Sequence, residues 1–129
     1  MQTQEQAQKQ VLVMLKKTDE FSSVFNFRKR LSSEFIVIHF KPNALNQARL
    51  GLVVSKKVAK SAVSRNYMRR VLRELFRTNQ VLINQCDLII RVQKRFNPLD
   101  FKQLEFEFKK LVLKLNTQLL KTSGINANP

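Results

Sequence analysis

The sequence predicts a single α+β domain, an α/β sandwich in which three helices pack on one sheet of about four strands. Its 129 residues suit one domain with a modest core. Apolar residues make up 43% of the chain and include ten phenylalanines, so the chain can bury a core and is not a disordered basic tail. Segments with helical spacing and short apolar runs follow one another in the order helix, strand, strand, strand, helix, strand, helix.

The start of the chain predicts a leader and a short helix. Residues 1–10 contain five glutamines and almost nothing to bury, so we expect a mobile segment there, followed by a domain over residues 11–121. A helix is expected from Thr18, as its cap, to about Asn26. Phe21 and Phe25 lie one turn apart on its apolar side. Their spacing leaves open whether they belong to the core or to a binding surface.

Three extended segments follow, at residues 28–31, 35–40 and 49–55. In the second, the side chains of residues 35, 37 and 39 point to one face and those of residues 36, 38 and 40 to the other. The third is a near-continuous apolar run, which predicts a central strand. His39 is the only histidine, and no Cys, Asp or Glu lies next to it in the sequence. We interpret it as a strand surface residue and not as a metal ligand or a base.

Residues 56–77 hold eight of the 24 lysines and arginines against one acid, Glu74. From Met68 onward, apolar residues recur at the spacing of a helix with one buried face. The opposite arc, about 140° wide, is basic and contains like-charge pairs four residues apart, which destabilise a helix. An ordinary solvated face would mix both signs of charge, so we expect this face to bind an anion. The arc is formed by Arg65, Asn66, Arg69, Arg70, Arg73 and Arg77.

The last third of the chain predicts one more strand and a long helix. Residues 87–92 form a buried strand, and the preceding Cys86 is a lone thiol that we expect to be inert in the core. Asn97 caps a helix that begins with Pro98, carries Asp100 in its first turn and runs to about Leu120. A disordered tail is expected at residues 122–129.

The net charge of +15 is the main indication of function. A compact domain with this charge repels itself, and a polyanion commonly balances such an excess. The longest apolar run near the N-terminus is the five-residue segment 11–15, too short for a membrane span or a signal peptide. Nucleic acid is therefore the expected partner, with no membrane partner and a cytoplasmic location.

Catalytic patterns are missing from the sequence. Two glycines cannot form a glycine-rich phosphate loop, and one histidine and one cysteine cannot form a zinc site or a nucleophile–base pair of common type. We expect no catalytic residue, no metal ligand and no small-molecule cofactor in this chain. Basic and aromatic groups remain, which bind RNA through phosphate contacts and base stacking. Tyr67 is one candidate for stacking on a base, but its position on the helix equally allows it to lie at the edge of the core.

The segment Arg-Asn-Tyr-Met-Arg-Arg-Val-Leu-Arg at residues 65–73, preceded by Leu-Gly-Leu-Val-Val-Ser-Lys-Lys-Val at 50–58, resembles the protein subunit of bacterial ribonuclease P. The resemblance extends to the helix with Phe21 and Phe25 and to the strand at 87–91. The third signature position, which in the family is commonly arginine, is Tyr67 here. The resemblance implies a mixed sheet with a left-handed crossover between the strands that flank the basic helix, where general rules predict a right-handed one.

The resemblance also implies a function. The protein would assist a catalytic RNA subunit, which uses Mg²⁺ to remove the 5′ leader from precursor tRNA, and would break no bond itself. The leader would lie in a cleft between the first helix and the sheet, against Phe21, Phe25 and the strand position Ile38, where the family often has tyrosine. The surface facing the RNA subunit would comprise Lys56, Lys57, Lys60, Arg65, Asn66, Arg69, Arg70 and Arg73.

Two alternative functions remain open at this point. Composition alone favours equally a non-enzymatic basic RNA-binding protein of ribosomal or RNA-chaperone type. A nuclease that acts without RNA is opposed by the shortage of acids and histidines.

Overall fold

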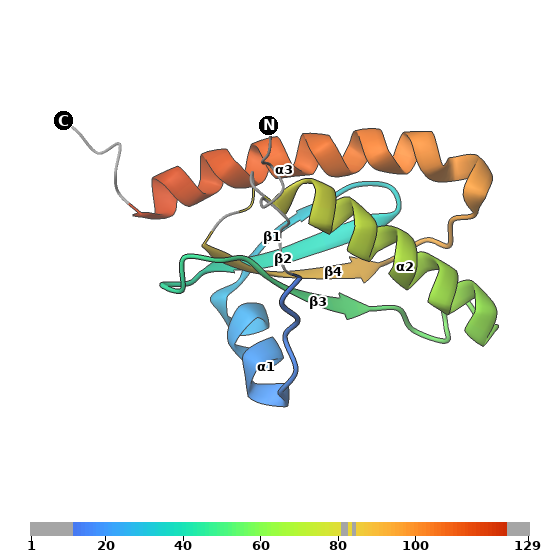
Figure 1. The fold of residues 1–129 in the computed structure, drawn as a ribbon, viewed down its shortest axis with the longest axis horizontal. Coiled ribbons are helices and arrows are strands. Elements are labelled where there is room, and N and C mark those ends of the chain that lie inside the picture. Colours follow the sequence, from blue (N-terminus) through green and yellow to red (C-terminus); the bar gives the residue numbers. More distant parts are fainter. Residues whose placement is uncertain (1–11, 81–82, 84, 124–129) are drawn as a thin grey trace, which may run out of the picture.

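The computed structural model describes residues 12–80, 83 and 85–123, so the prediction for residues 1–10 lies outside the described part. Of the tail predicted at 122–129, residues 122 and 123 are helical, which corrects its start, and residues 124–129 lie outside the described part. The described part contains three α-helices and a four-stranded sheet, which confirms the predicted α+β class (Figure 1). The elements follow the predicted order: α1 Thr18–Phe27, β1 Lys29–Ser32, β2 Ile36–Pro42, β3 Arg49–Val53, α2 Ala62–Thr78, β4 Cys86–Val92, the short 3₁₀ helix η3 Pro98–Asp100, and α3 Phe101–Ser123.

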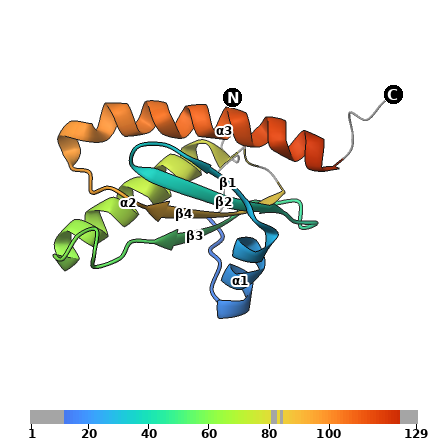
Figure 2. The same ribbon diagram turned by 180° about the vertical axis from the view of Figure 1, so that it is seen from behind.

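The sheet is mixed, with the strand order β1-β2-β4-β3. β2 pairs antiparallel with β1 and β4, whereas β3 and β4 are parallel and are joined through α2. The helices α2 and α3 cover one face of the sheet, and α1 lies against the other (Figures 1 and 2). The left hand of the β3–α2–β4 crossover stays a prediction.

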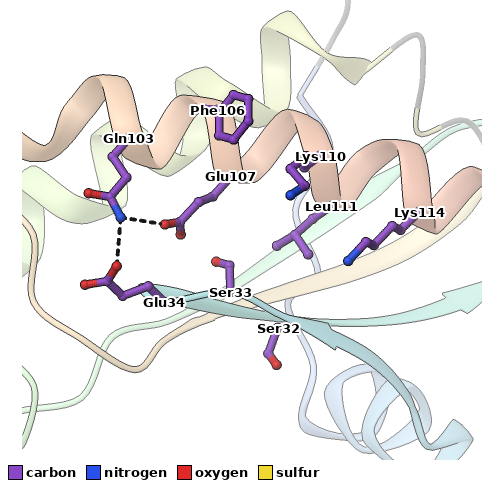
Figure 3. A pocket seen from close by; sticks show the side chains of 9 residues that line it. All are labelled: Ser32, Ser33, Glu34, Gln103, Phe106, Glu107, Lys110, Leu111 and Lys114. Carbon is purple, nitrogen blue, oxygen red and sulfur yellow. Dashed lines mark hydrogen bonds between the residues drawn. The ribbon is translucent and has the colours of Figure 1, made fainter.

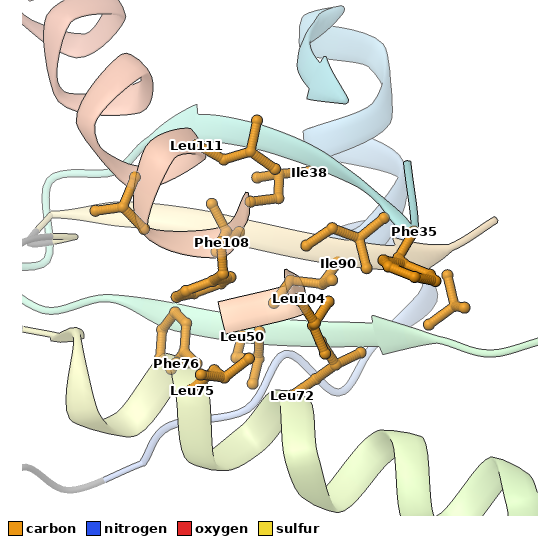
Figure 4. Close-up of a cluster of buried hydrophobic side chains, with 14 of the residues drawn as sticks. Phe35, Ile38, Leu50, Leu72, Leu75, Phe76, Ile90, Leu104, Phe108 and Leu111 are labelled. Carbon is orange, nitrogen blue, oxygen red and sulfur yellow. The ribbon is translucent and has the colours of Figure 1, made fainter. Parts of the chain in front are cut away.

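The main core lies between the sheet and the pair α2 and α3. Figure 4 shows Phe76 of α2 and Phe108 of α3 directed at the strands that carry Ile38, Leu50 and Ile90. All five side chains are fully buried. Burial of each contributes roughly 1.5–3 kcal/mol relative to an exposed position, so this layer fixes where α2 stands on the sheet.

β3 is an edge strand, and the prediction of a central strand is wrong. Its apolar run has two other causes. α2 and the side chain of Phe21 cover its two faces, and the backbone at residues 13–15 pairs with its outer edge through Leu50 (2.8 and 2.9 Å). An edge strand covered on three sides is as apolar as a central one.

The caps explain where the helices begin. Lys17, not Thr18, is the cap residue of α1, and the carboxylate of Glu20 accepts hydrogen bonds from the backbone N–H groups of Lys16 and Lys17 (2.7 and 3.0 Å). These two bonds are the main reason why the pKa of Glu20 is lowered. Ser61 caps α2 through Val63 and Ser64 (3.1 and 3.3 Å), and the predicted cap at Asn97 is confirmed.

Candidate nucleic-acid interface

The loop between β3 and α2 presents Lys56, Lys57 and Lys60 to solvent, and all three are exposed. Its shape is fixed by Arg65 in the first turn of α2, whose guanidinium donates to the backbone oxygens of Ala59 and Lys60 (3.0 and 2.8 Å). Two donors of Arg65 are thus used inside the protein. Arg65 positions the three lysines as well as adding charge to the surface.

The outer face of α2 continues this basic surface with Arg69, Arg70 and Arg73. No salt bridge joins any of the three to an acid in the described part of the chain; the single acid of α2, Glu74, pairs with Arg77 (2.6 Å). Arg69 donates to the amide oxygen of Asn66 (3.2 Å). Uncompensated cations one helical turn apart repel one another, and a row of phosphates relieves that repulsion.

Tyr67 points away from this basic row and toward the edge of the core. Its ring makes an edge contact with Phe96, with 6.2 Å between the ring centres, and the guanidinium of Arg70 lies 5.8 Å from its ring centre. The sequence left open whether Tyr67 belongs to the core edge or to a surface for RNA. The structure places its half-buried ring at the edge of the core, and RNA contact by Tyr67 stays a prediction.

A second surface forms where α1 crosses the opposite face of the sheet. The ring of Phe21 lies so close to Gly51 that a methyl group there would be 2.7 Å from it, and this contact holds α1 to β3. Phe25 is 36% exposed, and its ring meets that of His39 edge-on, with 4.7 Å between centres. Phe21 is therefore mainly a packing residue, whereas Phe25 is accessible to a ligand.

The assignment of Ile38 to this surface is wrong. Ile38 is fully buried and packs with Ile90 under α3, on the face opposite α1 (Figure 4). The strand position beside Phe25 is its neighbour His39, which pairs with Arg30 and Ile89 in the sheet. Successive residues of a strand point to opposite faces, so an offset of one residue moves the side chain to the other layer.

His39 lies among cations. Arg91 on β4 donates to its Nε2 (3.4 Å), and Arg30 stands beside it on β1. Burial, followed by the charges of Arg91 and Arg30, lowers the pKa of His39 below its ordinary value of 6.5. The sequence-based interpretation of His39 as a surface residue was therefore incomplete, because its partners come from three other elements.

Acid should weaken the fold through His39. The pKa of His39 is lower in the folded state, so as the pH falls the unfolded chain binds a proton before the folded chain does. The contribution of neutral His39 to the free energy of unfolding is therefore complete above about pH 6.5 and is lost below it. We expect the free energy of unfolding to fall between pH 7 and pH 5, by at most about 1.4 kcal/mol per pH unit, and less so in His39→Gln. Urea titrations at three pH values measure this.

The carboxylates provide the internal control, since the pKa values of Glu20, Glu34 and Glu74 are lowered from 4.5 and these groups act only at more acidic pH. An equal loss of stability in the wild type and in His39→Gln above pH 5 would contradict the role of His39.

The described residues do not assemble a recognisable catalytic centre. No group of three or more His, Cys, Asp and Glu side chains comes together among them, and no described helix could span a membrane. Cys86 is buried, and burial raises the pKa of its thiol to about 12, so it remains protonated and unreactive. This arrangement is suited to binding, through cations on one face of the sheet and aromatic rings on the other.

Comparison with known proteins decides the family. The sequence pattern of the family described as Ribonuclease P matches residues 11–116. The chain belongs to the ribonuclease P protein family. Among curated relatives, the ribonuclease P protein component of Chromobacterium violaceum is 51% identical over 82 residues, which are 64% of this chain and 68% of that protein. That of Azoarcus sp. is 51% identical over 78 residues, 60% of this chain and 65% of that protein.

Solved structures of ribonuclease P proteins share the fold. The protein from Staphylococcus aureus is 27% identical, with a TM-score of 0.68 over 81% of this chain and 95% of that chain. The protein from Thermotoga maritima is 29% identical, with a TM-score of 0.57 over 84% of this chain and 93% of that chain. The family pattern at residues 11–116 spans both surfaces described above, α1 with its sheet face and α2 with its preceding loop.

Proposed function

We propose that this chain is the protein subunit of a cytoplasmic ribonuclease P ribonucleoprotein and assists a catalytic RNA in removing the 5′ leader of precursor tRNA. The observation that carries the proposal is the basic row on α2 and its loop, which forms no salt bridge with any described acid, in a member of the ribonuclease P protein family. Such a row neutralises phosphates of a structured RNA.

The side chains present indicate which part of the reaction the protein supports and which part the RNA partner performs. The described residues supply cations and rings and no group of three or more His, Cys, Asp and Glu side chains, and in this proposal cleavage is assigned to the RNA partner. Mg²⁺ would be bound mainly by that RNA, because the described residues offer no cluster of metal ligands. Precursor tRNA is the second RNA ligand in this proposal, with its single-stranded leader crossing the sheet at Phe25 and His39.

Reconstitution tests the proposal directly. Precursor tRNA is incubated with a bacterial ribonuclease P RNA at low Mg²⁺, with and without this protein. We expect cleavage at the 5′ end of the mature tRNA only when both components are present, because the protein's cations replace part of the metal's charge screening. Cleavage that is unchanged by the protein would refute the proposal and favour a ribosomal or chaperone-type protein. Cleavage by the protein without RNA would favour a nuclease.

The exposed ring of Phe25 allows a sharper test than Phe21. If Phe25 stacks on a leader base, Phe25→Ala should weaken binding of precursor tRNA to the ribonucleoprotein by about 1–3 kcal/mol and leave binding of mature tRNA unchanged. Phe21→Ala is less suitable because it also removes the contact with Gly51. Equal losses for the two tRNAs, at unchanged thermal stability of the protein, would exclude leader stacking by Phe25.

A further inference from the structure

A pocket lies where the first half of α2 meets the loop between β4 and α3. Its volume is about 470 Å³. From α2 it is lined by Asn66, Tyr67 and Arg70, and from the loop by Arg95, Phe96 and Asn97 among others. It shares Arg70 with the basic row on α2, and Tyr67 and the loop residues extend it toward the edge of the core.

The charge of this pocket differs from that of two other pockets on the described surface. The pocket between α3 and the turn after β1, shown in Figure 3, contains Glu34 and Glu107, which both accept hydrogen bonds from Gln103 (2.7 and 2.9 Å). The pocket beside α1 contains Asp19, Glu20 and Asp87. The pocket at Tyr67 has two arginines and no carboxylate in its lining, so an anion can enter it without facing a like charge.

The aromatic part of the pocket is fixed in place. Phe96 is only 2% exposed and packs edge-on against Phe35, with 6.1 Å between ring centres, and Tyr67 packs on Phe96 in turn. Arg70 lies over the ring of Tyr67. A ligand that stacks on Tyr67 therefore needs little further ordering of the two rings.

The polar groups of the pocket are mostly hydrogen-bond donors. The amide oxygen of Asn66 accepts from Arg69, and that of Asn97 accepts from the backbone of Leu99 (2.9 Å), which leaves the NH₂ group of each amide for a ligand. Arg95 is exposed and forms no salt bridge within the described residues. Donors and cations beside a flat ring match the phosphate and the acceptor atoms of a nucleotide.

We infer that this pocket binds an unpaired nucleotide of the RNA subunit, with the base stacked on Tyr67 and Arg70 and the phosphate near Arg95. The inference rests on the proposed function, which supplies the RNA. It also gives Tyr67 a role of its own, as a stacking surface for a base.

Nucleotide titration of the full-length protein tests the pocket without the RNA subunit. Binding of AMP and of ribose 5-phosphate, which lacks the base, is followed by NMR chemical shifts. We expect AMP to bind between about fivefold and a hundredfold more tightly, because only AMP can stack. Tyr67→Leu, which keeps an apolar side chain against Phe96, should abolish the difference. Equal affinities for the two ligands in the wild type would overturn the inference.

Phe106→Leu is the matched control. Phe106 is a 64% exposed aromatic residue with Lys110 over its ring (5.6 Å), as Tyr67 has Arg70, but its pocket contains carboxylates. This variant should retain the preference for AMP. Loss of the preference in Phe106→Leu would place the AMP site on α3 and overturn the inference. Arg95→Gln, at an exposed position that cannot unfold the protein, should weaken binding of both ligands.

Binding of the RNA subunit to Tyr67 variants, measured over a range of salt concentrations, distinguishes a stacking contact from a charge contact. Tyr67→Leu should weaken RNA binding between about fivefold and a hundredfold and leave the slope of log affinity against log salt unchanged. Tyr67→Arg should steepen this slope by about one, because it adds a charge, without restoring affinity at high salt. Wild-type affinity of Tyr67→Leu in a ribonucleoprotein that still cleaves precursor tRNA would refute the pocket alone. A preference for AMP in a protein that supports no cleavage would refute the proposed function and leave the nucleotide pocket standing.

Discussion

Asp87→Ala should lower the free energy of unfolding by about 3 kcal/mol, because it breaks a buried ion pair. Asp87 lies on β4 and is 5% exposed. Its carboxylate accepts two hydrogen bonds from Arg49 of β3 (2.8 and 2.7 Å) and one from Asn43 (2.7 Å), and Arg49 also reaches Glu20 of α1 (3.2 Å). Removing the carboxylate leaves the half-buried guanidinium and the amide of Asn43 without their main acceptor.

Chemical denaturation with matched variants measures this effect. Glu34→Ala breaks an exposed ion pair with Lys94 and should cost much less than Asp87→Ala, because water screens the exposed charges. The double replacement Arg49→Met with Asp87→Leu should recover most of the loss, because it removes both charges together. A loss below about 1 kcal/mol for Asp87→Ala would show that water replaces the carboxylate and that the network does not hold α1, β3 and β4 together.

The triple replacement of Lys56, Lys57 and Lys60 by alanine should reduce RNA-subunit affinity on the order of 10²-fold near 0.1 M salt. If each lysine contacts one phosphate, the slope of log affinity against log salt should become shallower by about 2.7. The three side chains are exposed on a loop whose shape is set by Arg65, so their removal leaves the fold intact. Arg65→Ala is a less suitable variant, because it removes a positive charge and also the hydrogen bonds that shape the loop.

The matched control removes the same charge elsewhere. Lys102, Lys109 and Lys114 are exposed on α3, and their replacement by alanine should change the slope by less than one. Arg69→Ala and Arg73→Ala, on the basic row of α2, should each reduce it by about one. Filter-binding titrations from 50 mM to 1 M salt provide the slopes. Equal slopes for the two triple variants would mean that the RNA responds to total charge and that the loop before α2 is no specific interface.

Several features could be predicted because they depend on residues close in the sequence. The period of apolar residues predicted α2 with its buried face, and the spacing of Arg69 and Arg73 placed them on one side of it. The cap at Asn97 is likewise local. The cap of α1 was missed although a local signal existed, since Glu20 stands three residues after Lys17, the spacing at which a carboxylate reaches back to the cap.

Other features depend on contacts between distant segments. The alternation of β2 predicted two faces, but only the position of α1 made His39 the partner of Phe25 and placed Ile38 under α3. β3 proved to be an edge strand because β4 inserts beside β2, a pairing that its apolar run does not encode. The contact between Tyr67 and Phe96 joins residues from two elements that meet only in the folded chain.

The sequence by itself therefore determined the elements, the excess of positive charge, the basic face of one helix and the resemblance to ribonuclease P proteins. These follow from side-chain chemistry and from the periods of helix and strand, which act over a few residues. The tertiary structure decided which strand face α1 covers, that Arg65 shapes the lysine loop, and that Tyr67 lines a pocket without carboxylates. These depend on strand order and on packing between layers, which no local period specifies.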